Sequence, residues 1–150
     1  MSSENPTLSM GFLIGQTYRK MVGILAARFK EYDITTEQFS VLCRLAEQDG
    51  ISQKEIAART VKDQPTTARI LDCLIRKGLV HKEMSAADRR SFLVYLTPLG
   101  RERLDVLLPL EKATLAEIFA GLDAEELARF RETHLQLHRQ LDALHQQQEA

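Results

Sequence analysis

The stretch that decides the fold is KDQPTTARILDCLIRKGLVHKEMSAADRRSFLVYLT, residues 62–97. Asp63 can cap a helix, and Pro65 falls in the first turn of that helix, where its missing backbone N–H leaves no hydrogen bond unmade. Gly78 is typical of the position just after a helix end. Between them, apolar residues recur at helical spacing and define one inward face. That face consists of Thr67, Ile70, Leu71 and Leu74.

Two short segments rich in β-forming residues follow this helix, LVHKEM at residues 79–84 and SFLVYL at residues 91–96. They alternate in part between apolar and polar side chains, and they flank the polar sequence SAADRR. This pattern predicts a β-hairpin with a polar tip. Arg89 and Arg90 would then lie together on the tip, next to Asp88.

Two further helices are predicted ahead of the quoted stretch. SQKEIAART, residues 52–60, has Ser52 at its start and Glu55 three residues later, which predicts a capping box in which each side chain binds the backbone N–H of the other residue. TTEQFSVLCRLAEQDG, residues 35–50, predicts an earlier helix capped by Thr35 or Thr36. Helix, turn, second helix and hairpin together predict a winged helix-turn-helix over residues 36–97, whose second helix enters the DNA major groove.

Three further helices are predicted toward the two ends of the chain. One covers residues 8–30, one begins at Thr97 and Pro98, and one begins at Asp123. In the last helix, apolar residues and one histidine recur at intervals of three and four, which predicts a seam against another helix. The seam consists of Leu127, Phe130, His134, Leu137, Leu141 and Leu144. A chain of this length has little left to cover both end helices, so we expect a dimer.

These patterns predict a mainly α fold with a small β-wing (α+β), organised as a single domain over residues 1–150. Within it, residues 36–97 form the DNA-binding region, and residues 1–35 and 98–150 form the dimerisation region.

The charge of the chain is unevenly distributed. Its 150 residues are 44% hydrophobic and 27% charged, which is the composition of a globular domain. The net charge is −1, yet residues 59–90 contain eight Lys and Arg against four acids, so this window carries +4 and the rest carries −5. A local positive charge indicates an acidic partner for one surface. Arginines on a hairpin tip suit backbone phosphates and the narrow minor groove of double-stranded DNA.

Secretion and membrane insertion are not expected. The sequence MSSENPTLSM lacks the cationic start and apolar core of a signal peptide, and no apolar run approaches the length of a membrane span. Cys43 and Cys73 are too few for a disulfide framework, so a reducing cytoplasm fits best. Buried inert thiols are commoner than sensor thiols, and the sequence does not decide whether either cysteine is redox-active.

An enzyme is not expected either, because the sequence contains no nucleophile with a placed base and no Gly-rich phosphate loop. We expect no cofactor. His134 and His138 stand four residues apart, which a helix can present to zinc, but no carboxylate or thiol is placed to complete the set. We therefore expect no metal, and we place these histidines at the dimer interface or in solvent.

The order of the motifs resembles the MarR family of bacterial transcription regulators. ITTEQFSVL, SQKEIAA, LDCLIRKGLV and DRRSFLVYLTPLGRERL carry the resemblance, which extends from about Leu8 to the last helix. The DRR element lies at the expected distance between the recognition helix and the strand that leads to LT..G. The resemblance implies a homodimeric winged-helix repressor or activator whose first and last helices interlock. It also implies that a small phenolic or other lipophilic ligand releases the DNA, as in many members.

The resemblance places DNA contacts at the start of the first helix of the pair, at the start of the recognition helix and on the wing. These positions are Ser52, Gln53, Gln64, Pro65, Thr66, Arg69, Asp88, Arg89 and Arg90.

On the wing, the resemblance makes Arg90 the probe of the minor groove. We expect Asp88 to accept hydrogen bonds from an arginine two residues along and to orient it. Pro65 and Ala68 depart from the serine and threonine that are commoner in the family, so the operator sequence does not follow from relatives.

Two alternatives stay open. A winged helix can serve as a protein-interaction module without DNA binding, although such a module would not need basic residues on both the recognition helix and the wing tip. A DNA-binding regulator can be constitutive or can respond to a ligand. The peroxide-sensing branch of the family has its reactive cysteine in the first helix, and here that helix has none. Candidates to line a ligand crevice, or else core residues, are Phe12, Tyr18, Phe39 and Tyr95.

Overall fold

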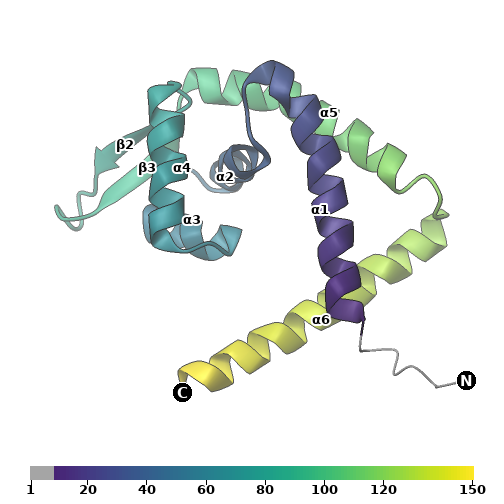
Figure 1. Cartoon of the computed structure of the whole chain (residues 1–150). Helices are drawn as coiled ribbons and strands as arrows, with labels where there is room; N and C mark the ends of the chain where they lie inside the picture. The colour runs from purple at the N-terminus through teal and green to yellow at the C-terminus, as the bar shows by residue number, and fades with distance from the viewer. Residues whose placement is uncertain (1–8) are drawn as a thin grey trace, which may run out of the picture. The chain divides into compact units, whose positions relative to one another are not determined.

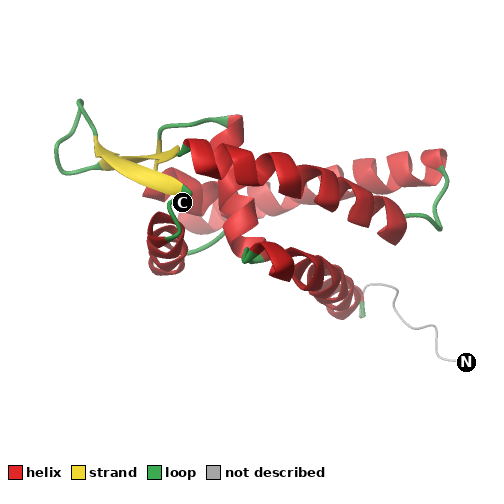
Figure 2. Ribbon diagram, turned by 90° about the horizontal axis from the view of Figure 1, so that it is seen from above, coloured by secondary structure: helices red, strands yellow, loops and turns green. Residues whose placement is uncertain are grey.

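The computed structural model describes residues 9–150, so Leu8, which we predicted in the first helix, lies outside the described residues. The described chain is mainly helical with a small antiparallel sheet, as predicted (Figures 1 and 2). Its elements are α1 (Met10–Phe29), the 3-10 helix η1 (Lys30–Tyr32), α2 (Thr36–Glu47), β1 (Ile51–Ser52), α3 (Gln53–Thr60), α4 (Gln64–Arg76), β2 (Val80–Met84), β3 (Phe92–Leu96), α5 (Pro98–Ile118) and α6 (Ala124–Glu149).

Contacts between residues divide the chain into two compact units, one that ends at Lys112 and one that begins at Ala113. The first unit holds α1 to α4, the sheet and most of α5, and it includes the whole predicted DNA-binding region. The second unit holds the end of α5 and all of α6. Between residues 9 and 150, no helix is both long enough and apolar enough to cross a membrane.

The sheet has three strands in the order β1-β3-β2. The predicted hairpin of β2 and β3 is confirmed, with Val80 opposite Leu96 at its base and Met84 opposite Phe92 at its far end. The strand β1 was not predicted. It pairs Ile51 with Val94, and with only two residues it is too short to show the alternation that identifies a strand in a sequence.

The core of the first unit lies between the helix pair and the sheet. All four residues of the predicted inward face of α4 are buried, with exposed fractions of 0–7%. They pack with residues of α2, α3 and the sheet, and the Phe29 and Phe39 rings meet with their centroids 4.9 Å apart. The helical period of α4 therefore identified the buried face correctly.

Side-chain caps start α2, α3, α4 and α6 as the sequence predicts, with one correction. The cap of α2 is Thr35, which forms a capping box with Gln38, and Asp63 and Asp123 cap α4 and α6. At α3 only half of the predicted capping box forms. The Ser52 hydroxyl accepts from the Glu55 backbone N–H at 3.2 Å, but the Glu55 carboxylate pairs with Arg59 at 2.8 Å instead of returning to the backbone of Ser52.

Hydrogen bonds and a close backbone contact join the wing to α5. The Thr97 hydroxyl donates to the Gly78 carbonyl at 2.6 Å and accepts from the Gly100 backbone N–H at 3.0 Å, so Thr97 caps α5 as predicted. The α5 backbone here runs so close to the chain after α4 that a Cβ atom at Gly100 would overlap the carbonyl oxygen of Leu79. Glycine is therefore required at this position of the LTPLG sequence.

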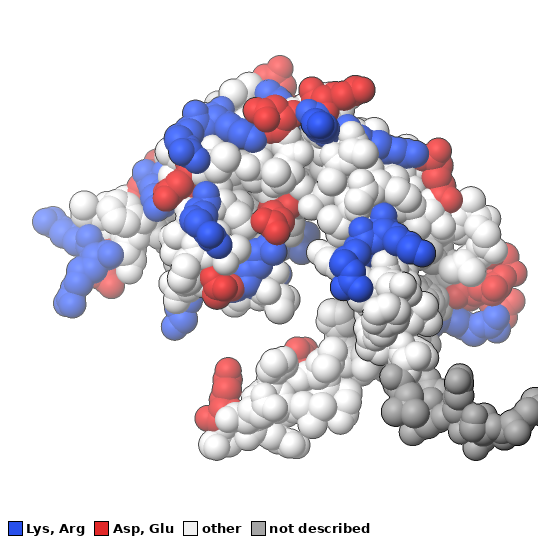
Figure 3. All heavy atoms as spheres, in the orientation of Figure 1, with Lys and Arg blue, Asp and Glu red and all other residues white. Residues whose placement is uncertain are grey.

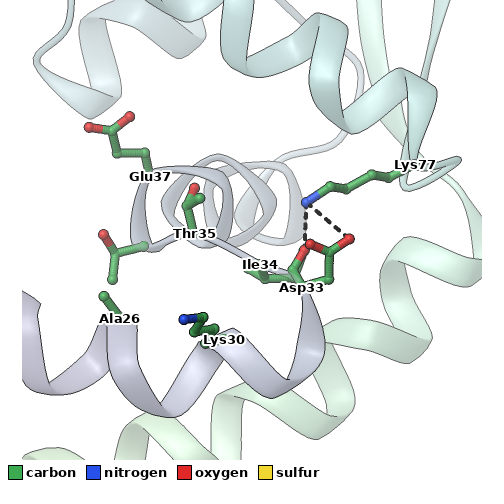
Figure 4. Close-up of a pocket in the computed structure, with 8 residues that line it drawn as sticks. Ala26, Lys30, Asp33, Ile34, Thr35, Glu37 and Lys77 are labelled. Atoms are coloured by element: carbon green, nitrogen blue, oxygen red, sulfur yellow. Dashed lines mark hydrogen bonds and ion pairs between the residues drawn. The ribbon is translucent and has the colours of Figure 1, made fainter.

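Polar contacts fix α4 to the segment that joins α1 and α2. The Lys77 ammonium group donates to the Asp33 carbonyl oxygen at 2.5 Å, and its nitrogen lies 3.7 Å from the Asp33 carboxylate (Figure 4). It also donates to Gln38 Oε1 at 3.0 Å. The Gln38 amide also donates to Cys73 Sγ at 3.2 Å. The recognition helix is thus anchored at its C-terminal end, opposite to the end that presents the predicted DNA contacts.

Candidate nucleic-acid interface

The first two turns of α4 present the predicted base-reading residues to solvent. Gln64, Pro65 and Arg69 are exposed and Thr66 is half-buried. The Asp63 carboxylate accepts a hydrogen bond from the Thr66 backbone N–H at 2.7 Å, and this bond lowers the pKa of Asp63 below its usual value. The Arg69 guanidinium donates to the Thr66 hydroxyl at 3.3 Å and so lies along the helix toward its start.

The start of α3 lies beside the start of α4. Gln53 Nε2 donates to the Gln64 carbonyl oxygen at 3.5 Å, a long bond that links the two helix starts. Ser52 is the cap of α3 and immediately precedes Gln53. The structure therefore brings the predicted contacts of both helices onto one surface of the first unit.

The wing tip is organised by Asp88, although in a different way from the one we predicted. Asp88 Oδ1 accepts from the Arg90 backbone N–H at 3.0 Å, and Oδ2 accepts from the Ser91 hydroxyl at 3.2 Å. A carboxylate that binds the backbone two residues on forms an Asx-type turn. Asp88 therefore shapes the backbone of the tip and does not hold an arginine side chain.

Arg89 and Arg90 keep their guanidinium groups exposed, and within residues 9–150 neither forms an ion pair or a side-chain hydrogen bond. Figure 3 shows basic side chains gathered at the far end of the β2–β3 hairpin. Unpaired cations are available to an acidic partner without first breaking an ion pair. This surface can hold a polyanion.

The four candidate ligand residues are not brought together. Phe12 and Tyr18 are exposed on α1, Phe39 is buried in the core, and Tyr95 stacks on His81 with ring centroids 5.4 Å apart. An open hollow of about 430 Å³ lies instead where α1, the start of α2 and the end of α4 meet (Figure 4). It is lined by Ala26, Lys30, Asp33, Ile34, Thr35, Thr36, Glu37 and Lys77.

The predicted seam of α6 is exposed except at His134, which is half-buried. Its four leucines and Phe130 have exposed fractions between 38% and 46%, and α6 has no buried residue. Within the second unit, the ring centroids of Phe130 and His134 are 4.6 Å apart. The ring centroid of Phe119, just after α5, lies 6.4 Å from that of Phe130.

The cysteines lie in different surroundings. Burial raises the pKa of the Cys43 thiol to about 11, and the nearby Glu111 carboxylate adds to this shift. The thiolate is the reactive form, so Cys43 is held in an unreactive state at neutral pH. Cys73 lies on α4, where its sulfur accepts the hydrogen bond from Gln38.

Sequence reasoning missed Gln38 and Lys77, which position the recognition helix. They are 39 residues apart and meet only in the folded chain. The capping role of Gln38 could have been found from its place three residues after Thr35, but its second bond had no local signal.

Comparisons with known proteins decide the family. A model of the MarR family matches residues 34–92, which contain α2, α3, α4 and most of the wing. The transcriptional regulator HosA of Escherichia coli O127:H6 is 33% identical over 98 residues, which are 65% of this chain and 73% of HosA. The chain belongs to the MarR family. The resemblance inferred from the sequence motifs is confirmed, and members of the MarR family are transcriptional regulators and not enzymes.

Two solved structures are similar to this MarR-family chain over almost all of its length. A cysteine-to-serine mutant of MarR from E. coli, solved with operator DNA, covers 91% of this chain and 99% of its own, with 27% identity and a TM-score of 0.83. BpsR from Bordetella bronchiseptica, whose DNA binding is regulated by 6-hydroxynicotinic acid, covers 89% and 98%, with 29% identity and a TM-score of 0.76. The winged-helix fold is shared by all three proteins.

Proposed function

We propose that this MarR-family regulator is a cytoplasmic repressor that binds double-stranded DNA as a homodimer at a pseudopalindromic operator. The observation that carries the proposal is the unpaired arginine pair on the wing tip, in the same compact unit as the exposed first turn of α4. Repression would follow from occupying DNA that the transcription machinery needs.

The DNA contacts divide by chemistry. The exposed Gln64, Pro65 and Arg69 suit base edges and phosphates of the major groove, since amide and guanidinium groups bind adenine and guanine there. Arg89 and Arg90 suit the minor groove and its phosphates. Ser52 and Gln53, at the start of α3, suit a phosphate of the backbone. The similarity to MarR, solved with operator DNA, supports this arrangement.

Dimerisation is supported by apolar side chains that the chain leaves uncovered. On α1, Phe12 and Tyr18 are 67% and 66% exposed. The seam of α6 has a heptad-like spacing, which typically packs against another helix. Exposed large apolar side chains gathered on one helix face, as on α6, mark an interface on a protein. A two-fold dimer would present two reading helices about one turn of DNA apart, roughly 34 Å.

Regulation by a small molecule is the finer part of the proposal. BpsR responds to a hydroxylated aromatic acid, and such a compound combines an apolar ring with an anion. The hollow beside α1 offers Ala26 and Ile34 as apolar walls and Lys30 as a cation. A ligand there would act through unequal affinity for the DNA-competent and incompetent shapes of the dimer.

A protein-interaction module without DNA binding is the alternative. Such a module would not need basic residues on both α4 and the wing. Retention of the protein on DNA at low salt distinguishes the two functions.

The decisive experiment selects bound fragments from genomic DNA and measures the affinity of the selected duplex. Arg90→Ala should weaken binding by about 1–3 kcal/mol without lowering the unfolding temperature, because the tip is remote from the core. Asp88→Ala should cause a smaller loss, through a looser tip. Arg131→Ala on α6 removes the same charge and serves as the control. If the wild-type protein selects no duplex, or if Arg90→Ala binds like wild type, the proposal is wrong.

The effector is tested by thermal shift and by DNA release with a panel of phenolic and hydroxylated aromatic acids. Compounds that stabilise the free protein should release DNA, and Lys30→Ala should weaken both effects. Strong DNA binding without a response to the panel would describe a constitutive repressor.

A further inference from the structure

The wing carries an apolar pair that the described residues leave about half exposed. Met84 ends β2 and Phe92 begins β3, and the two residues lie directly opposite each other in the ladder. They are 57% and 49% exposed, although both are large and apolar. Opposite residues in an antiparallel pair have their side chains on the same face, so they form one continuous patch.

This patch extends the inner face of the hairpin beyond the core. Side chains two residues apart share a face of a strand, so Met84 and Phe92 lie on the same face as Val80, Val94 and Leu96. Those three residues are buried against the helices. Toward the tip the hairpin leaves the core, and the same face becomes exposed just before the loop that carries Arg89 and Arg90.

We propose that Met84 and Phe92 are a second DNA contact of the wing, packing on the deoxyribose walls of the minor groove beside the arginine tip. The inference rests on the proposed DNA binding. The continuity of the patch with the cationic loop selects the occupant, because a tip held at a minor groove brings the adjoining face of the hairpin to the sugars that line it. Apolar side chains beside basic ones are a recurrent feature of proteins that bind this groove.

Apolar contact and ionic contact differ in their response to salt. Each phosphate that a cation neutralises adds about 0.9 to the slope of log K against log salt, because counterions are released. Packing of a ring on a sugar releases no counterion. Covering part of the exposed half of Phe92, on the order of 60 Å² of apolar surface, corresponds to about a tenfold change in affinity.

The experiment measures binding of the full-length protein to the duplex that the wild type selects, at several salt concentrations between about 50 and 200 mM. Phe92→Ala should bind about tenfold more weakly at every salt concentration, with an unchanged slope. Arg90→Ala should lower the slope. Phe92→Leu keeps most of the apolar area and should stay within about threefold of wild type. Met84→Ala should behave like Phe92→Ala.

The pair also stabilises the hairpin by cross-strand packing, and the slope separates this role from direct contact. If Phe92 only supported the wing, Phe92→Ala would displace both arginines and lower the slope as Arg90→Ala does. Closure of the hairpin is followed by hydrogen exchange of the Ser85 amide, which donates to the Ser91 carbonyl at 2.9 Å. A lowered slope in Phe92→Ala, or an affinity within twofold of wild type, would overturn the inference, the latter leaving the patch for a protein partner. If the wild type selects no duplex, the proposed function itself fails.

Discussion

In the first unit, the apolar face of α4 is 0–7% exposed, whereas in the second unit the apolar face of α6 is 38–46% exposed. Both helices carry their apolar residues at helical spacing, so the periodicity is equally informative in each. The difference lies in what the chain supplies opposite the face. The sheet and neighbouring helices cover α4, and no residue of α6 is buried. Periodicity shows that a face is built for burial, and it does not show whether the covering surface belongs to the same chain.

Charge on the α6 seam is expected to have the largest effect. Leu141→Glu would place two unpaired carboxylates in the interface of the proposed dimer, and truncating a leucine alone costs about 2–5 kcal/mol where it is fully buried. The two-fold symmetry doubles the loss for each dimer. Sedimentation should show a monomer, and DNA binding should be lost although Leu141 touches no DNA.

Gln140→Glu is the matched control, since it adds the same charge to the adjacent position outside the seam. A Leu141→Glu protein that stays dimeric and still binds the selected duplex would show that α6 packs on its own chain, and the contrast between the two units would disappear.

The close contact where the wing joins α5 tests whether the stability of the first unit arises within a single chain. Gly100→Ala places a methyl group against the Leu79 carbonyl oxygen, so the backbone must move, and overpacking of this kind costs about 1–3 kcal/mol. The loss should appear in urea unfolding at every protein concentration, because it arises within one chain.

Gly121→Ala provides the comparison, because a Cβ atom there meets no described atom within 4 Å. Its stability should remain near that of the wild type. Equal stability of the two variants would mean that the junction is looser than described.

The smallest effect is expected at Val61, in the turn between α3 and α4. This residue is 91% exposed and has a φ of +54°, a left-handed conformation that a β-branched residue adopts only with strain. Val61→Gly should raise the free energy of unfolding by about 0.5–1 kcal/mol, the relief of strain less the added freedom of the unfolded chain.

Val61→Gly should also leave the dimer intact, in contrast to changes at the exposed leucines of α6. Val61→Ala, which keeps the left-handed strain in part, should lie between the wild type and Val61→Gly in thermal unfolding. A loss of stability in Val61→Gly would show that the valine side chain makes a stabilising contact. Because Val61 is 91% exposed within one chain, that contact would be with another molecule.

Local patterns in the sequence identified most of the fold. Caps at Thr35, Asp63 and Asp123 marked helix starts because a capping bond spans only three residues. The wing was marked by two alternating segments around a polar tip. The strand β1 was missed because it is only two residues long and is defined by its partner, β3.

The site was predicted less completely than the fold, for a physical reason. The positions of the tip residues followed from motif spacing. The role of Asp88 depends instead on the backbone geometry of residues 88–91, which brings its carboxylate to the Arg90 backbone N–H and the Ser91 hydroxyl and not to a guanidinium group. The exposed pair of Met84 and Phe92 looks like ordinary strand in the sequence. Only the register and the edge of the core reveal that it is uncovered.

The polar contacts of Lys77 connect the recognition helix α4 to the segment that follows α1. Its ammonium group joins the end of α4 to the carbonyl of Asp33, at the end of η1, and η1 continues directly from α1. Because these contacts hold the C-terminal end of α4, we expect α4 to follow a rotation of α1 and η1. In the dimer that we propose, α1 would set the orientation of the recognition helix in each subunit. The fit of the dimer to the operator would then depend on the angle of α1 in each subunit. A molecule bound beside Lys77 would then change the orientation of both recognition helices without altering the DNA-contacting residues of either subunit.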